Sequence, residues 1–393
     1  MAGPLKSLKV LDFSTLLPGP YASMMLADMG ADVLRIESPT RLDLVRFLPP
    51  MDGDTSASHA FLNRGKRSLA LDLKQPGATD IIKKLISDYD VVLEQFRPGV
   101  MDRLGIGYSV LSEINPSLIY CSITGYGQTG PYKDRAGHDI NYLALAGISS
   151  YSGRKEQGPP PLGIQVADVA GGSHHAVMGL LAAVIHRQQT GEGQFVDVSM
   201  TDAAFAMNGM SGAGYLAAGV EPKAEEGVLN GGGFYDYYET EDGRYLAVGG
   251  LEPAFMKALC DLLERPDLVS IGLSQNKDDQ QEFKTFLKGC FKQRDYNHWL
   301  RVFEQVDACV EPVLSFSESV SHPQMKARGM VIEVARPDGS MQQQIGYPIK
   351  FSGTECQSAY TGVQLGQHTE EVLLEQGYSE DQLKQYRERR LFG

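Results

Sequence analysis

Residues 137–142 (GHDINY) carry the densest group of chemically active side chains in the sequence. His138 suits general acid–base catalysis, because the ordinary pKa of imidazole lies near neutrality. The stretch stands just before an apolar segment at 142–148 that predicts a helix. An alternative is therefore a helix cap made by Asp139 or Asn141, with His138 as a bystander. The residues alone leave both interpretations open.

Two carboxylates stand where predicted helices begin. Asp168 opens a long helical pattern at 168–189 and is soon followed by a Gly-Gly pair, and Glu252 precedes Pro253 at the start of another helix. A helix N-terminus stabilises a carboxylate, and its free N–H groups can hold an oxyanion beside it. Proline favours the first helical position. Taken alone, each carboxylate is more simply explained as the acid of a first helical turn.

Positively charged side chains gather in the first hundred or so residues. Several follow predicted strands, where the ligands of open α/β sheets bind, and a phosphate-bearing ligand would use such residues. The alternative, solvated surface charge, suits most of them. The cluster comprises Arg35, Arg41, Arg46, Arg64, Lys66, Arg67, Lys74, Arg97 and Arg103.

Other motifs narrow the chemistry. Residues 125–130 (GYGQTG) match G-x-G-x-x-G, but no convincing helix follows and no acid stands about 20 residues on, so an active-site loop is favoured over a dinucleotide site. There is no phosphate-binding P-loop and no G-x-S-x-G nucleophile elbow. The five cysteines are scattered without a C-x-x-C pair, which predicts neither zinc nor disulfides and favours a reducing compartment.

Strand and helix signals alternate along the first part of the chain. Apolar runs at 8–13, 32–36, 68–71, 91–93, 118–122 and 194–198 predict strands, and helical patterns separate them. This order predicts an α/β, doubly wound, mostly parallel sheet. Composition shifts near residue 217, and an Asp-Gly turn between β-rich runs at 234–248 predicts a hairpin, followed by three helical patterns. A smaller α+β domain is expected there.

The composition excludes some classes of protein. The chain has 393 residues, 42% of them apolar, and 36 Lys+Arg against 49 Asp+Glu give a net charge of −13. An acidic chain is not expected to bind nucleic acid or an anionic membrane as its main partner. No signal peptide is evident, and no continuous apolar run approaches the roughly 18 residues of a membrane span. A cytoplasmic protein is expected, or one of the peroxisomal or mitochondrial matrix in a eukaryote.

Several blocks of sequence resemble the family III CoA-transferases, and among them most closely the α-methylacyl-CoA racemases. The blocks run along nearly the whole chain and include VLDFSTLLPGPYASMMLADMGADVLRIE, NRGKRSLALDLKQPGA, LEQFRPGVMDRLGIGY, SITGYGQTGPYKDRAGHDINYLALAG, VADVAGGS, GEGQFVDVSMTD, DGRYLAVGGLEPAF and DACVEPVLSF. AGHDINY and LEPAF resemble the racemases in particular.

This resemblance implies roles for single residues. His138 and Asp168 match the two racemase acid/bases, and Glu252 matches a glutamate that orients the histidine. Leu71, Lys74, Gln95, Phe96, Arg97 and Arg103 match positions that contact CoA. Many relatives have Arg where this chain has Ser38, so Arg41 is expected to supply that contact. CoA is then part of the substrate, and neither a metal nor a nicotinamide is expected.

The resemblance also implies a fold and a reaction. A large Rossmann-like CoA-binding domain at 1–217 and 330–393, completed by the C-terminal tail, is joined to a linker and small α+β domain at 218–329, in an interlocked homodimer. Glu252 would then come from the partner subunit. The expected reaction interconverts (R)- and (S)-2-methylacyl-CoA through an enolate, held by N–H groups near Asp168 and Gly171. The alternative is CoA transfer between carboxylic acids, with Asp168 as a nucleophile that forms an aspartyl-CoA thioester.

Overall fold

A computed structural model describes residues 3–356 and 359–392. The chain divides into two compact units. The first consists of the described residues of 1–146, 162–207 and 323–393, and the second consists of 147–161 and 208–322. These units differ from the bounds that the resemblance implied: residues 147–161 and 208–217 group with the second unit, and residues 323–329 group with the first.

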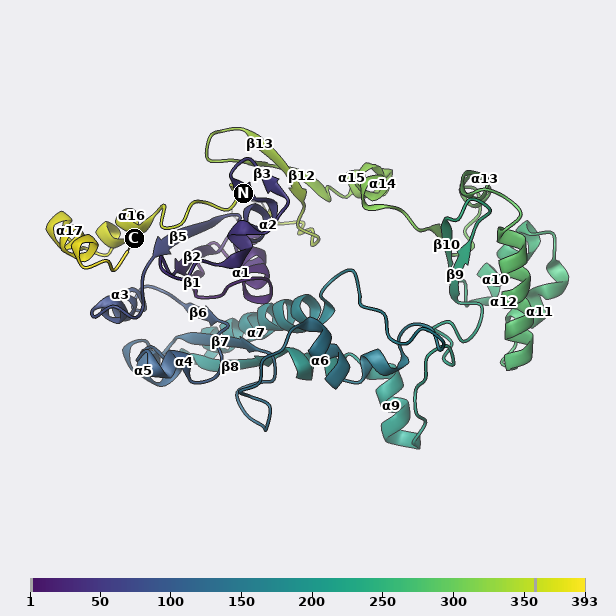
Figure 1. The fold of residues 1–393 in the computed structure, drawn as a ribbon, viewed down its shortest axis with the longest axis horizontal. Coiled ribbons are helices and arrows are strands. Elements are labelled where there is room, and N and C mark those ends of the chain that lie inside the picture. The colour runs from purple at the N-terminus through teal and green to yellow at the C-terminus, as the bar shows by residue number, and fades with distance from the viewer. Residues whose placement is uncertain (1–2, 357–358, 393) are drawn as a thin grey trace. The chain divides into compact units, whose positions relative to one another are not determined.

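A six-stranded, fully parallel sheet forms the centre of the first unit (Figure 1). All six strands predicted from the sequence are present, with ends that differ by one or two residues. In spatial order the strands are β5 (Lys66–Ala70), β2 (Asp32–Glu37), β1 (Lys9–Asp12), β6 (Val91–Glu94), β7 (Ile119–Thr124) and β8 (Gln194–Ser199). The central strands β1, β2, β6 and β7 were recognisable because a strand covered on both faces reads as a continuous apolar run, whereas β8 at the edge alternates between more and less exposed residues.

Helices cover the sheet. The core between the sheet and the helices is built from buried side chains such as Leu11, Leu34, Ile82 and Val92. The principal helices of this unit are α1 (Pro18–Asp28), α3 (Ala78–Leu85), α5 (Tyr108–Ile114), α7 (His175–Thr190) and α8 (Met200–Ala206). A hairpin of β12 (Val331–Ala335) and β13 (Met341–Ile345) also belongs to it.

The predicted helix at 168–189 is continuous but not uniform. Its first part, η3 (Ala167–His174), is a π-helix, and α7 follows it. The whole stretch is long and apolar enough to pass a length and composition test for a membrane span, with a hydropathy of 1.2. No continuous apolar run of that length is present, as expected, but alanine and the larger aliphatic residues raise the mean hydropathy of this helix enough to pass the test. The core helix of a water-soluble domain passes the same test, and α7 packs on β7 and β8.

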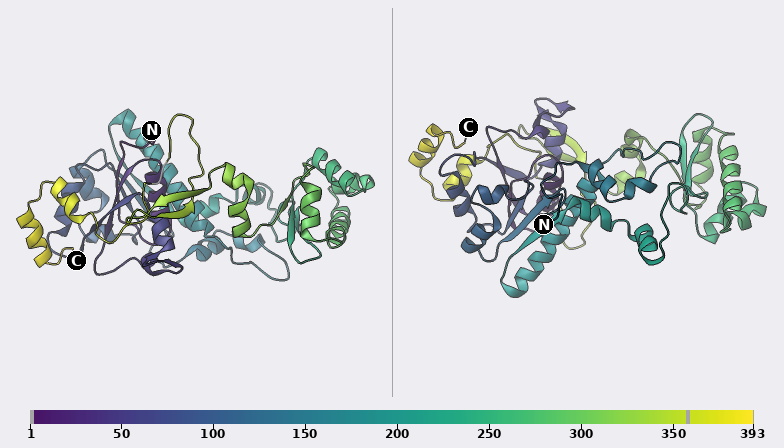
Figure 2. Two further views of the ribbon diagram at one scale, coloured as in Figure 1. Left: turned by 90° about the horizontal axis from the view of Figure 1, so that it is seen from above. Right: turned by 60° about the horizontal axis from the view of Figure 1, so that its bottom comes forward.

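The C-terminal segment covers the outer edge of β5. The N–H of Ala70 donates to Thr369 Oγ1 (3.0 Å), and the N–H of Asp72 donates to the carbonyl of Leu391 (2.7 Å). The two helices of this segment are α16 (Thr369–Glu375) and α17 (Glu380–Glu388), and both views of Figure 2 show the yellow segment at this side of the unit. An edge strand with unpaired donors invites aggregation, and this segment satisfies them.

The second unit has its own sheet and core. The predicted hairpin is present, as β9 (Asp236–Glu239) and β10 (Tyr245–Val248), and β11 (Val310–Pro312) pairs antiparallel with β10. Helices α10 (Pro253–Leu262), α12 (Lys277–Phe291) and α13 (Tyr296–Phe303) bury an aromatic core against it. Arg154 joins residues 147–161 to this unit through a bidentate ion pair with Asp236, with N–O distances of 2.8 and 2.5 Å.

Candidate active site

The two candidate acid/base segments lie at one edge of the parallel sheet. The strand β7 leads through residues 125–138 to α6 (Asp139–Leu145), and η3 precedes the helix that returns to β8. Both segments therefore stand where the strands end, at the edge where open α/β sheets bind their ligands. The start of α7 and α6 are close together in Figure 1, and η3 packs directly against α6, α1 and α8.

His138 is the N-cap residue of α6, with extended backbone angles of φ −133° and ψ 173°. Its N–H donates to Oδ1 of Asn141 (3.0 Å), so the side chain of the third helical residue reaches back to the cap. The hypothesis that Asp139 or Asn141 is the N-cap was therefore wrong. The imidazole of His138 is exposed, as a group that meets a substrate must be.

Gly137 fixes the approach to His138. Its carbonyl accepts a hydrogen bond from the hydroxyl of Tyr142 (2.5 Å), and the rings of Tyr126 and Tyr142 meet edge to face at 5.3 Å. A Cβ at residue 137 would lie 2.7 Å from Tyr126 Oη and 2.7 Å from Tyr142 Cε1. Glycine is the residue that fits between the two rings.

Asp168 is in the first turn of η3, and the Gly171-Gly172 pair behind it permits close packing. A Cβ on Gly172 would lie 3.1 Å from Pro18 of α1 and 3.1 Å from Met200 of α8. The hydroxyl of Ser173 donates to the carbonyl of Pro18 (2.7 Å). The glycines therefore let η3 pack closely against α1 and α8, and this packing fixes the position of the turn that carries Asp168.

Asp139 connects the two segments, a role that the sequence did not reveal. Its Oδ1 accepts the N–H of Asp168 (3.0 Å), 29 residues further along the chain. Burial, and then the charge of Asp139, raises the pKa of Asp168 to about 6, while the charge of His138 opposes this shift. His138 and Asp168 are thus close enough to interact. The N–H of Asp168 is already bound to Asp139, so an enolate oxygen at this place would have to be held by other N–H groups near Asp168 and Gly171.

The cations of the cluster fall into two groups. Five of the nine pair with carboxylates of the first unit, and one of these, Arg67, also pairs with a carboxylate of the C-terminal segment. The pairs are Arg35 with Glu37 and Asp43, Arg46 with Glu37, Arg64 with Asp28, Lys66 with Asp12, and Arg67 with Asp32 and Glu375. The alternative of solvated surface charge was therefore wrong for most of these five, because Arg35, Arg64 and Lys66 are each 1% exposed and are paired with carboxylates inside the unit.

The other four, Arg41, Lys74, Arg97 and Arg103, are exposed, and within the part of the chain that the structure describes none forms an ion pair. These are the four cations that the resemblance assigned to CoA. They follow β2, β5 and β6, at the same edge as His138 and Asp168. The side chain of Arg103 folds back over Gly99, which stands between Arg97 and Arg103 in the sequence. A Cβ on Gly99 would lie 3.1 Å from Nη1 of Arg103.

The three uncharged candidates for CoA contact have different surroundings. Leu71 is 1% exposed, so a contact with a ligand would come from its main chain. Phe96 is half-buried and packs against the core. Oε1 of Gln95 accepts the N–H of Gly19 (2.8 Å) at the start of α1. In a dinucleotide site the N–H groups at this place bind pyrophosphate. Here the residues on either side of Gly19 are prolines, so the start of α1 offers no such cradle.

Glu252 is the exposed N-cap residue of α10, and Pro253 is the first helical residue, as expected. It belongs to the second unit, whereas His138 and Asp168 belong to the first. The pKa of the Cys309 thiol is raised by burial and by the charges of Asp307 and Glu252. The carboxylate of Glu252 is therefore close enough to Cys309 to act on it. The N–H of Gly249 donates to the carbonyl of Cys309 (2.9 Å), which attaches the loop before Glu252 to the start of β11.

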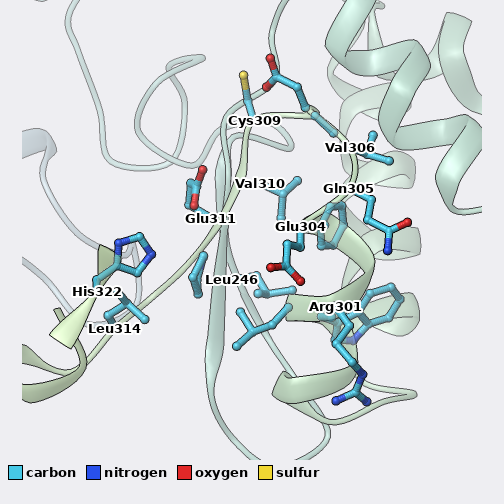
Figure 3. A pocket seen from close by; sticks show the side chains of 16 residues that line it. Leu246, Arg301, Glu304, Gln305, Val306, Cys309, Val310, Glu311, Leu314 and His322 are labelled. Carbon is cyan, nitrogen blue, oxygen red and sulfur yellow. The ribbon is translucent and has the colours of Figure 1, made fainter. Parts of the chain in front are cut away.

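Each unit contains a cavity. One of about 670 Å³ is in the second unit beside α13 and β11, and Figure 3 shows its lining, which includes Arg301, Glu304 and Glu311. It contains none of the residues that the resemblance assigned to catalysis or to CoA contact. The other, of about 400 Å³, lies in the first unit at the ends of β2 and β5, with Pro39 and Ala70 in its wall. Two residues in the wall of this second cavity, Pro39 and Ala70, are close in sequence to Arg41 and Leu71.

Comparisons with known proteins agree with the resemblance. Residues 5–369 match the model of CoA-transferase family III. Alpha-methylacyl-CoA racemase of Homo sapiens is 36% identical, over 97% of this chain and 95% of the relative. Succinyl-CoA:glutarate CoA-transferase of Homo sapiens is 32% identical, over 95% of this chain and 86% of the relative. The crystal structure of a CAIB/BAIF family protein from Brucella suis superposes with a TM-score of 0.83 at 29% identity, over 96% of this chain and all of that chain. The chain therefore belongs to CoA-transferase family III and has the mixed α/β fold of that family.

Proposed function

We propose that this protein is a racemase or epimerase that interconverts (R)- and (S)-2-methylacyl-CoA thioesters. The observation that carries this proposal is the proximity of two acid/base groups, His138 and Asp168, joined by the hydrogen bond from the N–H of Asp168 to Asp139. Inversion at a carbon needs one group on each face, since a single base would return the proton to the face from which it was taken.

The proposed mechanism follows from the residue types. Neutral His138 removes the α-proton from one face of the thioester, and the electron pair of the C–H bond moves to the carbonyl as an enolate. Protonated Asp168 returns a proton to the opposite face, and for the other enantiomer the roles are exchanged. A pKa of about 6 makes both protonation states of Asp168 accessible near neutral pH. The proton that enters is not the proton that left, so solvent hydrogen is incorporated.

We propose that the CoA part of the substrate is held by Arg41, Lys74, Arg97 and Arg103, with Leu71, Gln95 and Phe96 nearby. Exposed cations without internal partners suit phosphate groups, because a bidentate guanidinium matches phosphate oxygens. CoA enters as part of the substrate, and the chemistry above calls for neither a metal nor a nicotinamide.

CoA transfer is the second candidate, because it uses the same carboxylate. Asp168 would attack the acyl carbonyl of the donor and release the CoA thiolate, which leaves a mixed anhydride. The thiolate would then attack the aspartyl carbonyl, which forms the aspartyl-CoA thioester and releases the donor as its carboxylate. A relative with a transferase name covers nearly the whole chain at similar identity to the racemase relative. This route does not need His138, and that difference separates the two candidates.

The first test is deuterium incorporation into a pure enantiomer of a 2-methylacyl-CoA in D2O, followed by mass spectrometry and by optical purity. Exchange with racemisation that is lost in His138→Ala and in Asp168→Asn supports the racemase. Absence of exchange, together with hydroxylamine-sensitive labelling of Asp168 by the acyl donor, would establish CoA transfer instead. Lys133→Ala, an exposed cation on the loop before His138, is a matched control that should behave as the wild type.

We also propose that the chain works as a homodimer in which Glu252 serves the His138 of its partner. None of the residues of α9 (Gly209–Ala218) is buried, and Met210 and Leu216 are 80% and 78% exposed, which leaves apolar surface for a second chain to cover. Mixing refolded Asp168→Asn and Glu252→Ala chains tests this. Hybrid dimers regain one intact site if the residues come from different chains, and regain none if both come from the same chain.

A further inference from the structure

The carboxylate of Asp139 joins the two acid/base segments, but the proposed reaction gives it no function. Asp139 is the first residue of α6, directly after His138, and its carboxylate binds the main chain of the residue that carries the other acid/base. No other hydrogen bond between a side chain of α6 and η3 occurs among the described residues. A change at Asp139 therefore acts on both segments together.

We propose that Asp139 is a positioning residue: its carboxylate binds the N–H of Asp168 and thereby fixes the first turn of η3, with the Asp168 carboxyl, relative to His138. The proposal rests on the proposed function, which assigns the acid/base roles. A helix N-terminus attracts an anion, so a carboxylate is well suited to this place. Loss of an acceptor would also leave the N–H of Asp168, which is half-buried, without its partner.

The charge of Asp139 has a second effect on the same group. It raises the pKa of Asp168 and so keeps more of that carboxyl protonated near neutral pH. The groups that act on Asp168 come from α6 and its cap, namely Asp139 and His138, with the hydroxyl of Tyr142 close by. On the other elements packed against η3, Tyr21 of α1 lies against His174, and Asp202 of α8 acts on Asp197.

Two substitutions separate the hydrogen bond from the charge. Asp139→Asn keeps an oxygen that accepts the N–H of Asp168 and removes the charge. Asp139→Ala removes both. Asp134→Asn, which changes an exposed carboxylate of the preceding loop, is the matched control for net charge. Circular dichroism and thermal melts confirm that each variant is folded before it is compared.

The primary readout is the titration of Asp168 itself, followed by NMR of protein labelled with 13C at the aspartate carboxyls, with Asp168→Asn to identify the signal. We expect a midpoint near pH 6 in the wild type and a midpoint lower by about half a unit or more in Asp139→Asn. Asp134→Asn should leave it unchanged. A midpoint in Asp139→Asn that equals or exceeds the wild-type value would overturn the effect of charge.

The second readout is α-proton exchange. We expect Asp139→Ala to lower kcat about 10- to 100-fold with KM changed less than about threefold, because a shift of the acid/base groups affects the reaction more than binding. Asp139→Asn should retain more of kcat, with its pH profile displaced to lower pH. Wild-type kcat in Asp139→Ala would overturn the positioning role. If the wild type transfers CoA and does not racemise, the proposed function fails, but the titration of Asp168 still tests Asp139.

Discussion

Gly137→Ala tests whether the two tyrosine rings fix the approach to His138. The new Cβ would lie 2.7 Å from Tyr126 Oη and 2.7 Å from Tyr142 Cε1, both closer than a carbon in van der Waals contact. The φ angle of Gly137 is not in the left-handed region, so the cost comes from crowding alone. Overpacking of this kind typically costs about 1–3 kcal/mol. Replacement of Gly by Ala returns about 0.4–1 kcal/mol through the unfolded chain. The expected net loss of unfolding free energy is about 1–2 kcal/mol.

Urea denaturation measures that loss, and α-proton exchange measures its effect on the neighbouring His138. We expect kcat to fall at least about 10-fold, because small displacements of a reacting group are costly. The double variant Gly137→Ala with Tyr126→Phe should regain part of both losses, since it removes one of the two atoms in the clash. Gly163→Ala is the control, because its Cβ would meet nothing within 4 Å. Equal stability and equal kcat in Gly137→Ala and Gly163→Ala would refute the reasoning.

Four further substitutions test other parts of the first unit. Arg97→Ala should raise KM for acyl-CoA about 10-fold with little change in kcat, as measured by steady-state kinetics. Arg67→Ala, which loses an internal ion pair, should lower stability in urea denaturation and leave KM unchanged. Asp28→Ala should cost about 3–5 kcal/mol in urea denaturation, because it leaves the guanidinium of Arg64 buried without its counter-ion. Burial raises the pKa of Glu94 to about 7, so its contribution to stability is complete below about pH 4.5 and is lost as pH rises through 7. Glu94→Gln should therefore be more stable than the wild type at pH 8 by about 1–3 kcal/mol, with a gap that closes toward pH 4.5.

Much of the fold could be predicted from the sequence because its signals are local. Buried parallel strands read as short apolar runs, and the Asp-Gly hairpin and the Glu252-Pro253 helix start depend on neighbouring residues only. The π-helical start at Ala167–His174 was missed, since its residues have the same composition as an ordinary helix. The strand β11 was missed as well, because three residues carry too little periodicity.

The sequence supplied candidate residues for the site but not their contacts. His138 was singled out by its residue type, and the resemblance then assigned acid/base roles to His138 and Asp168. The bond between Asp139 and Asp168 spans 29 residues of sequence, and no local pattern reveals which N–H a carboxylate will reach. The cation cluster shows the same limit. Only the structure separates Arg64, whose carboxylate partner lies 36 residues away, from Arg97, which has no carboxylate partner in the described part of the chain.

The cover over β5 has a consequence for synthesis of the protein on the ribosome. The segment that binds Ala70 and Asp72 comes some 300 residues later in the chain, at Thr369 and Leu391. The donors of β5 therefore stay uncovered while the rest of the sheet and the whole second unit are made. During that interval the nascent chain presents an open strand edge, which is a target for chaperones and for other nascent chains. A stop codon before residue 369 would leave that edge open permanently, even though His138 and Asp168 had already been translated.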